Sequence, residues 1–149
     1  MRLDYQGKTQ QGYLYFLVMV LLLTISNIKL DGYDEKYLYI QFVVFTFTIL
    51  TVCFRFKFTI YEKKLTYRIQ LFIFQIYQKE IEINEIKQIK FTRVGWAKKG
   101  AIVKVTKGFN IRIFDFEPNH VYTDLLEFAN NNSITIFKTK DYLILEKLK

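Results

Sequence analysis

Two long apolar runs without a single charge lie in the first 54 residues, and they constrain the fold more than any other feature. They are YLYFLVMVLLLTISNI at 13–28 and YLYIQFVVFTFTILTVCF at 37–54. As helices they would be roughly 24 and 27 Å long, close to the thickness of a bilayer's hydrocarbon core. Both runs are apolar on every side, and the remaining chain offers little helix to cover them as a soluble bundle would. We therefore predict a transmembrane hairpin at 13–54, with spans at about 13–30 and 37–54.

The charges near these runs predict an orientation. The first 54 residues carry four basic and four acidic residues, so the net charge of +8 belongs to residues 55–149. The connector KLDGYDEK offers two basic residues, whereas the outer flanks offer seven: Arg2, Lys8, Arg55, Lys57, Lys63, Lys64 and Arg68. The positive-inside rule then places both termini in the cytoplasm and the protein in the inner membrane. A cleaved signal peptide at the first run is the weaker interpretation, because TISNIKL lacks a small-x-small cleavage pattern.

From residue 56 the period changes to that of β-strands. FKFTIY and LTYRI alternate on either side of the turn EKK, and LFIFQIYQ is apolar on both faces, as a central strand or a membrane-facing one would be. AIVKVT and FNIRIF predict a second hairpin around Lys107-Gly108. Pro118 and an apolar stripe then predict a helix at 118–130. Strands followed by one packed helix indicate a small α+β domain.

The ends of the chain are assigned by composition and period. Residues 1–12 are expected to be an N-terminal tail, and the β domain is expected to cover 55–138, with SITIF as a short strand near its end. Residues 139–149 are predicted to be a C-terminal tail or an extra strand.

The segments FTIYEKKLTYRI, IEINEIKQIKF and AIVKVTKGFNIRIF, together with the helix 118–130, follow the two-span hairpin in a recognisable order. This order resembles bacterial membrane proteins that carry a pleckstrin-homology-like (PH-like) domain. The resemblance implies an antiparallel β-sandwich or partly open barrel, capped by one helix, that serves as an interaction or assembly module. It carries over no catalytic residue.

Binding is more plausible than catalysis for the basic part of the chain. The candidates for contact with lipid or a partner are Lys57, Lys63, Lys64, Arg68, Trp96, Lys98 and Lys99. Trp96 beside two lysines combines an interfacial anchor with attraction to anionic headgroups, although a tryptophan can equally fold into the core. The basic residues in this set either form a binding surface or only determine the orientation of the predicted spans in the membrane.

Few residues of the sequence are candidates for catalysis or metal binding. His120 is the single histidine and has no nucleophile at a suitable spacing, and Glu80, Glu82 and Glu85 fit a solvated strand face better than a metal site. Cys53 is alone, so neither a disulfide nor a zinc site is expected. No cofactor, metal or small-molecule substrate is predicted. Nucleic acid is disfavoured because the cations are dispersed and no RNA-binding motif is present.

These observations predict a membrane-anchored, non-catalytic module that faces the cytoplasm and acts through a protein partner or a homo-oligomer, with membrane lipids around its spans. The alternative is a sensor of anionic lipid headgroups at the inner membrane surface. An uncharacterised enzyme is the weakest hypothesis.

Overall fold

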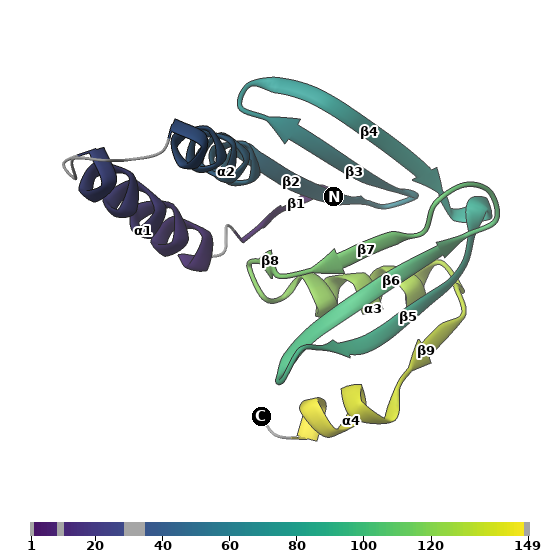
Figure 1. Cartoon of the computed structure of the whole chain (residues 1–149). Coiled ribbons are helices and arrows are strands. Elements are labelled where there is room, and N and C mark those ends of the chain that lie inside the picture. The colour runs from purple at the N-terminus through teal and green to yellow at the C-terminus, as the bar shows by residue number, and fades with distance from the viewer. Residues whose placement is uncertain (1, 9–10, 29–34, 148–149) are drawn as a thin grey trace. The chain divides into compact units, whose positions relative to one another are not determined.

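A computed structural model describes residues 2–8, 11–28 and 35–147, which divide into two units (Figure 1). Unit 1 comprises Met1–Lys8, Phe56–Gln70 and Gln75–Lys149. Unit 2 comprises Thr9–Arg55 and Leu71–Phe74 and contains both long helices. Each unit is described by itself.

Two sheets form the β structure of the described residues. The five-stranded sheet has the order β4-β3-β2-β1-β8, and the four-stranded sheet has the order β7-β6-β5-β9. Strands of the first sheet are β1 (Arg2–Gly7), β2 (Phe54–Tyr61), β3 (Lys64–Leu71), β4 (Phe74–Glu82) and β8 (Phe116–Glu117). Those of the second are β5 (Ile86–Val94), β6 (Lys98–Val105), β7 (Ile111–Phe114) and β9 (Ile136–Lys138). The described helices are α1 (Gln11–Ile28), α2 (Glu35–Cys53), the single 3-10 turn η1 (Ile83–Glu85), α3 (Val121–Asn131) and α4 (Lys140–Lys147).

The core of unit 1 follows from the alternation of its strands. Phe58 on β2, Leu65 on β3 and Phe91 on β5 are fully buried, and the two sheets share one apolar cluster with α3 and Tyr142 of α4. Burying a side chain of this size contributes about 1.5–3 kcal/mol. The helix α3 joins the cluster through one stripe, which consists of Val121, Tyr122, Leu125, Phe128 and Ala129.

The α+β class with two sheets is confirmed, and so is the predicted hairpin of AIVKVT and FNIRIF, which forms β6 and β7. Three local expectations are corrected. The expected tail 1–12 contains β1, which pairs antiparallel with β2 and β8. The run LFIFQIYQ is not one strand, because the chain turns at Phe72 and Ile73 between β3 and β4. The last segment forms α4 rather than a tail or strand.

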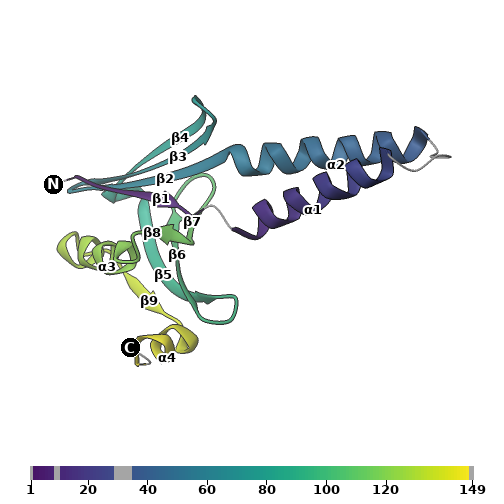
Figure 2. The same ribbon diagram turned by 90° about the vertical axis from the view of Figure 1, so that its left-hand side faces the viewer.

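Within unit 2, α1 and α2 lie side by side (Figures 1 and 2). Their contact buries little, since Val20 and Thr48 are the buried side chains among those described on these helices. The hydroxyls of α2 bond back to their own helix: Thr46 donates to the Phe42 carbonyl at 2.9 Å, and Thr48 donates to the Val44 carbonyl at 2.7 Å.

The transmembrane hairpin predicted at 13–54 is wrong. Across residues 2–8, 11–28 and 35–147, the structure has no helix with both the length and the apolar character needed to cross a membrane. The described helix α1 has polar ends at Gln11 and Asn27, so its mainly apolar part is about 20 Å long, whereas a hydrocarbon core is about 30 Å thick. Glu35 and Lys36 begin α2, and Gln41 interrupts it. The connector at residues 29–34, including the predicted turn at Asp31-Gly32, lies outside the described residues.

Two further predictions are corrected. Because no described helix could span a membrane, the multi-pass inner-membrane localisation with cytoplasmic termini is not supported. The resemblance to bacterial membrane proteins with a PH-like domain is also wrong. In the described chain the strands form two separate sheets, not a closed barrel. One of these sheets is mixed, because β9 runs parallel to β5, with Ile89 opposite Ile136.

Candidate functional site

The structure divides the predicted binding residues between the β2–β3 hairpin and the β5–β6 turn of unit 1. Lys63 is exposed in the β2–β3 turn, whereas Lys57 on β2 and Arg68 on β3 are half-buried. Lys64 is half-buried and donates to Glu80 Oε2 at 2.9 Å. This hydrogen bond from Lys64 holds the pKa of the Glu80 carboxyl below its usual value. Lys64 is therefore paired with a carboxylate on β4.

Trp96, Lys98 and Lys99 lie at the β5–β6 turn. Trp96 is 95% exposed, so it is not a core residue. Gly95 precedes it with φ +57°, a conformation that glycine adopts without the strain a side chain would bring. The Lys99 ammonium lies 5.6 Å from the centroid of the Tyr142 ring, within the range of a cation–π contact.

The two turns belong to different sheets, and both views of the ribbon place them well apart (Figures 1 and 2). The seven predicted residues therefore do not form one surface patch. Whether either turn binds lipid or a protein partner stays a prediction.

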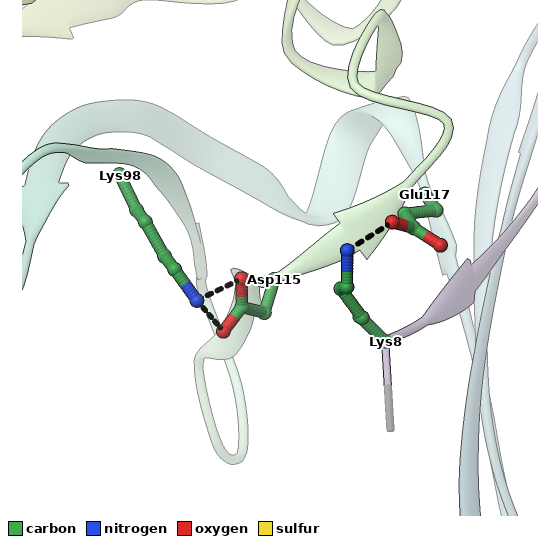
Figure 3. Close-up of polar contacts among 4 residues, drawn as sticks. All are labelled: Lys8, Lys98, Asp115 and Glu117. Atoms are coloured by element: carbon green, nitrogen blue, oxygen red, sulfur yellow. Dashed lines mark hydrogen bonds and ion pairs between the residues drawn. The ribbon is translucent and has the colours of Figure 1, made fainter. Parts of the chain in front are cut away.

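Two ion pairs flank β8 beside the β5–β6 turn (Figure 3). The Lys98 ammonium donates to both carboxylate oxygens of Asp115 at 2.7 Å, and Lys8 donates to Glu117 Oε1 at 2.8 Å. These pairs line a cavity of about 410 Å³, together with Asn119 and Tyr122 among others. Lys8 and Lys98 already have carboxylate partners, whereas Lys99, which also lines the cavity, lies over the Tyr142 ring.

A second cavity of about 540 Å³ lies along α3, and we name it the α3 groove. Leu3, Ile60 and Tyr61 of the β1–β2 pair line one side, and His120, Asp124 and Phe128 line the other. Asp124 accepts a hydrogen bond from the Tyr5 hydroxyl and lies 3.6 Å from His120 Nε2. Burial, followed by the hydrogen bond to Asp124, raises the pKa of Tyr5 far above its usual value, so Tyr5 remains a neutral donor.

Few of the described residues are placed to take part in catalysis. No group of three or more potential ligands from His, Cys, Asp and Glu is arranged to hold a metal ion there. Glu82 and Glu85 instead cap the short turn η1, where the Glu85 carboxylate accepts a hydrogen bond from the Glu82 backbone at 3.1 Å. His120 is 59% exposed and has an acid beside it rather than a nucleophile.

Most of the exposed large apolar side chains of the described chain belong to unit 2. We define the hairpin surface as the exposed large apolar side chains of unit 2, which lie on α1, α2, the start of β2 and around the β3–β4 turn. Among them, Phe42 and Phe47 on α2 are 70% and 68% exposed, and Ile73 in the turn is 92% exposed. The other members are Tyr15, Phe16, Val18, Met19, Leu21, Leu22, Leu23, Ile25, Tyr39, Ile40, Val43, Val44, Ile49, Leu50, Phe54, Phe72 and Phe74. In other proteins, large exposed apolar patches are typical of protein or membrane interaction sites, ligand grooves or aggregation-prone surfaces.

No protein-family model matches this chain, and no curated protein is significantly similar to it. The choice among functions therefore depends on the residues themselves.

The sequence reasoning missed several residues of these sites. Tyr5 and Lys8 were assigned to a tail, although RLDYQ alternates polar and apolar residues as a strand does. Asp115 and Asp124 carry no local signal, because their partners Lys98 and Tyr5 are 17 and 119 positions away.

Proposed function

We propose that this protein is a non-catalytic assembly module that binds a second copy of itself through the hairpin surface. The observation that supports this proposal most directly is the gathering of large exposed apolar side chains on α1, α2 and the β3–β4 turn.

The packing of unit 2 explains why it needs a partner. A helix that is apolar on all sides has to be covered on all sides, whereas two helices packed together cover only the seam between them. Val20 on α1 and Thr48 on α2 mark this seam. Side chains on other faces, such as Met19 and Phe47, stay 50% and 68% exposed.

The chemistry of the hairpin surface favours a partner of the same kind. The sequence from Tyr37 to Phe54 carries no charge that could select an oppositely charged surface. Thr46 and Thr48 direct their hydroxyls to carbonyls of their own helix, so covering α2 with another apolar helix leaves these groups hydrogen-bonded. Copies of one chain meet most often through identical surfaces around a two-fold axis.

The exposed area is sufficient for such an interface. Six aromatic side chains of the hairpin surface are between 58% and 78% exposed: Tyr15, Tyr39, Phe42, Phe47, Phe72 and Phe74. At roughly 150–250 Å² for a whole aromatic side chain, these six expose on the order of 600–1,000 Å². A standard interface buries about 800 Å² on each partner.

Binding of anionic lipid headgroups is the weaker candidate. It is favoured by the exposure of Trp96 beside Lys99. It is weakened because Lys64 and Lys98 are engaged by Glu80 and Asp115, and because the two turns lie apart.

Sedimentation velocity of the full chain over a range of concentrations tests the assembly proposal. We expect a discrete dimer or higher oligomer, and we expect the double variant Phe42→Gln, Phe47→Gln to dissociate at least tenfold more readily. The matched control is Phe109→Gln, since Phe109 is 87% exposed but lies in the β6–β7 connection of unit 1; this control should associate as the wild type does.

Three outcomes would overturn the proposal. The first is a wild-type chain that stays monomeric at every concentration. The second is association that Phe42→Gln, Phe47→Gln leaves unchanged. The third is uptake by phosphatidylcholine vesicles with loss of self-association, which would assign the hairpin surface to lipid instead.

A further inference from the structure

The four-stranded sheet of unit 1 carries basic side chains and no acidic ones. None of its strands β5, β6, β7 and β9 contains aspartate or glutamate. Their basic residues are Lys87, Lys90, Arg93, Lys98, Lys99, Lys104, Arg112 and Lys138. The five-stranded sheet differs, because its strands include the acidic residues Asp4, Glu80, Glu82 and Glu117. Positive charge is therefore concentrated on one of the two sheets.

Three of these basic residues share the face of the sheet that points away from the core. Phe91 on β5, Val103 on β6 and Ile113 on β7 are fully buried and belong to the core cluster. Side chains alternate between the two faces of a strand. The residue beside each of them therefore lies on the opposite face, which we name the outer face and which carries Lys90, Lys104 and Arg112.

The pairing of the strands brings these three residues together. Lys90 lies opposite Ile102, and Ile102 lies opposite Arg112, so the three form one row across the sheet. Phe137 on β9 lies opposite Lys90 and extends this row. Lys104 follows Ile102 by two positions on β6. From the spacing of strands and of residues along them, the Cα atoms of the three basic residues lie within about 10 Å of one another.

No carboxylate offsets this group of charges among the described residues. Arg112 is exposed, Lys90 and Lys104 are half-buried, and none of the three has a described acidic partner. The Lys90 ammonium lies 5.6 Å from the centroid of the Phe137 ring, which is 48% exposed. Like charges that lie close together on a sheet destabilise it. An anion bound between them would therefore be stabilising.

We propose that the outer face of the four-stranded sheet binds single-stranded nucleic acid. The phosphates pair with Lys90, Lys104 and Arg112, and an unstacked base packs on Phe137. Proteins bind such strands by combining cations that follow the backbone with aromatic rings that stack on bases. The dispersal of these cations along the sequence, which disfavoured nucleic acid, does not persist once the strands pair. These contacts involve phosphates and one ring face, so they select no base sequence.

An anionic membrane surface fits the outer face less well. A bilayer attracts cations too, but its anchors are amphipathic side chains that project into the interface. Trp96 projects in this way, with 95% exposure at the β5–β6 turn, whereas Phe137 lies on a strand within the sheet. A ring in that position meets a base that is laid across the sheet. Lipid binding is therefore an outcome that the experiment has to distinguish.

Fluorescence anisotropy of a short labelled oligothymidylate, titrated with the full-length protein, tests the proposal. We expect saturable binding whose logarithm falls with the logarithm of salt concentration at a slope of about −2, as three phosphate contacts to a single strand would give. An abasic oligonucleotide of the same length and charge should bind about fivefold more weakly, because it offers no base to stack.

A charge variant and a matched control locate the surface. Lys104→Gln, Arg112→Gln should weaken binding of the oligothymidylate about tenfold at low salt and make the salt slope shallower by about 1.4. Lys63→Gln, Lys147→Gln removes the same charge from exposed positions in the β2–β3 turn and on α4. This control should bind as the wild type does. Far-UV circular dichroism confirms that both variants are folded.

The ring is tested separately. Phe137→Leu keeps an apolar side chain on β9 and should weaken binding of the oligothymidylate about fivefold while leaving binding of the abasic strand unchanged.

Four results would overturn the proposal. The wild-type chain does not bind the oligothymidylate, the control loses as much affinity as the charge variant, or the abasic strand binds equally well. The fourth is binding to phosphatidylserine vesicles in place of the oligothymidylate, which would assign the outer face to lipid. The proposal does not depend on self-association, and the Phe42→Gln, Phe47→Gln chain should bind the oligothymidylate as the wild type does.

Discussion

Phe91 and Phe42 are both phenylalanines, but they lie in different environments. Phe91 lies on β5 of unit 1 and is fully buried, whereas Phe42 lies on α2 of unit 2 and is 70% exposed. In unit 1, apolar residues alternate with polar ones along strands, so a sheet can turn one face inward and keep the other in water. In unit 2, apolar residues occupy every side of the helices, and no single inward face exists. The first arrangement gives a core, and the second gives a surface that another molecule has to cover.

The largest expected effect comes from truncating these two phenylalanines. Phe91→Ala should lower the free energy of unfolding by about 3–5 kcal/mol, because it leaves a cavity in the shared core. Phe42→Ala should change the stability of unit 1 by less than about 0.5 kcal/mol, as is usual for exposed sites, and act on self-association instead. Urea unfolding followed by far-UV circular dichroism measures both. Trp96 fluorescence is a poor probe because that side chain is already 95% exposed. Similar losses for the two variants would contradict the division into core and binding surface.

A smaller effect is expected at Gly100 on β6, where the core of unit 1 has no room for a methyl group. A Cβ atom at this position would lie 2.4 Å from Val94 Cγ2 and 2.8 Å from Phe114 Cδ1. Gly100→Ala should therefore destabilise the fold by about 1–3 kcal/mol, the range for overpacking. The measurement is again the urea midpoint.

Adding Val94→Ala to Gly100→Ala removes the nearest clashing atom and should recover part of the loss. Such coupling is expected for residues in contact. If the two substitutions were simply additive, the crowding at Gly100 would not be the cause.

The sequence was informative where local period decides structure. The alternation of AIVKVT and FNIRIF and the apolar stripe of 118–130 predicted β6, β7 and α3, because burying one face fixes both the element and its orientation. The periodicity of apolar residues gave a wrong prediction at Phe72 and Ile73, because the chain turns there without glycine, proline, asparagine or aspartate. It also failed for unit 2, where uniform apolar composition predicted a bilayer although the described helices do not meet the requirements of a span.

Sites were harder to predict than elements, because partners are brought together only by the fold. Trp96 was rightly considered for an exposed role. The neutralisation of Lys98 by Asp115 depends on the pairing of β6 with β7 and on the path of the chain after β7. The Tyr5–Asp124 contact depends on β1. The alternation of polar and apolar residues in this strand could have predicted it, but the segment was assigned to a tail.

The smallest expected effect concerns the edge of the unit 1 core, at Tyr142 on α4. Its ring packs 5.4 Å from that of Phe91 and is 3% exposed. Burial, with a contribution from the negative charge of Glu146, raises the pKa of Tyr142 to about 12. In the unfolded chain a tyrosine titrates near 10. Between about pH 10 and 12 the unfolded state therefore loses a proton that the folded state keeps.

The sign of the pH dependence follows directly. The contribution of Tyr142 to stability is complete below about pH 10 and is lost as the pH rises toward 12. Tyr142→Phe keeps the ring and its contact with Phe91 but removes the ionisable hydroxyl. The urea midpoint of this variant should therefore fall less steeply than that of the wild type between pH 10 and 12. Part of the slope should remain, because burial also raises the pKa of Tyr5 and Tyr122. Parallel curves for the two proteins would mean that the Tyr142 hydroxyl reaches water in the folded state, and that the core of unit 1 is open at α4.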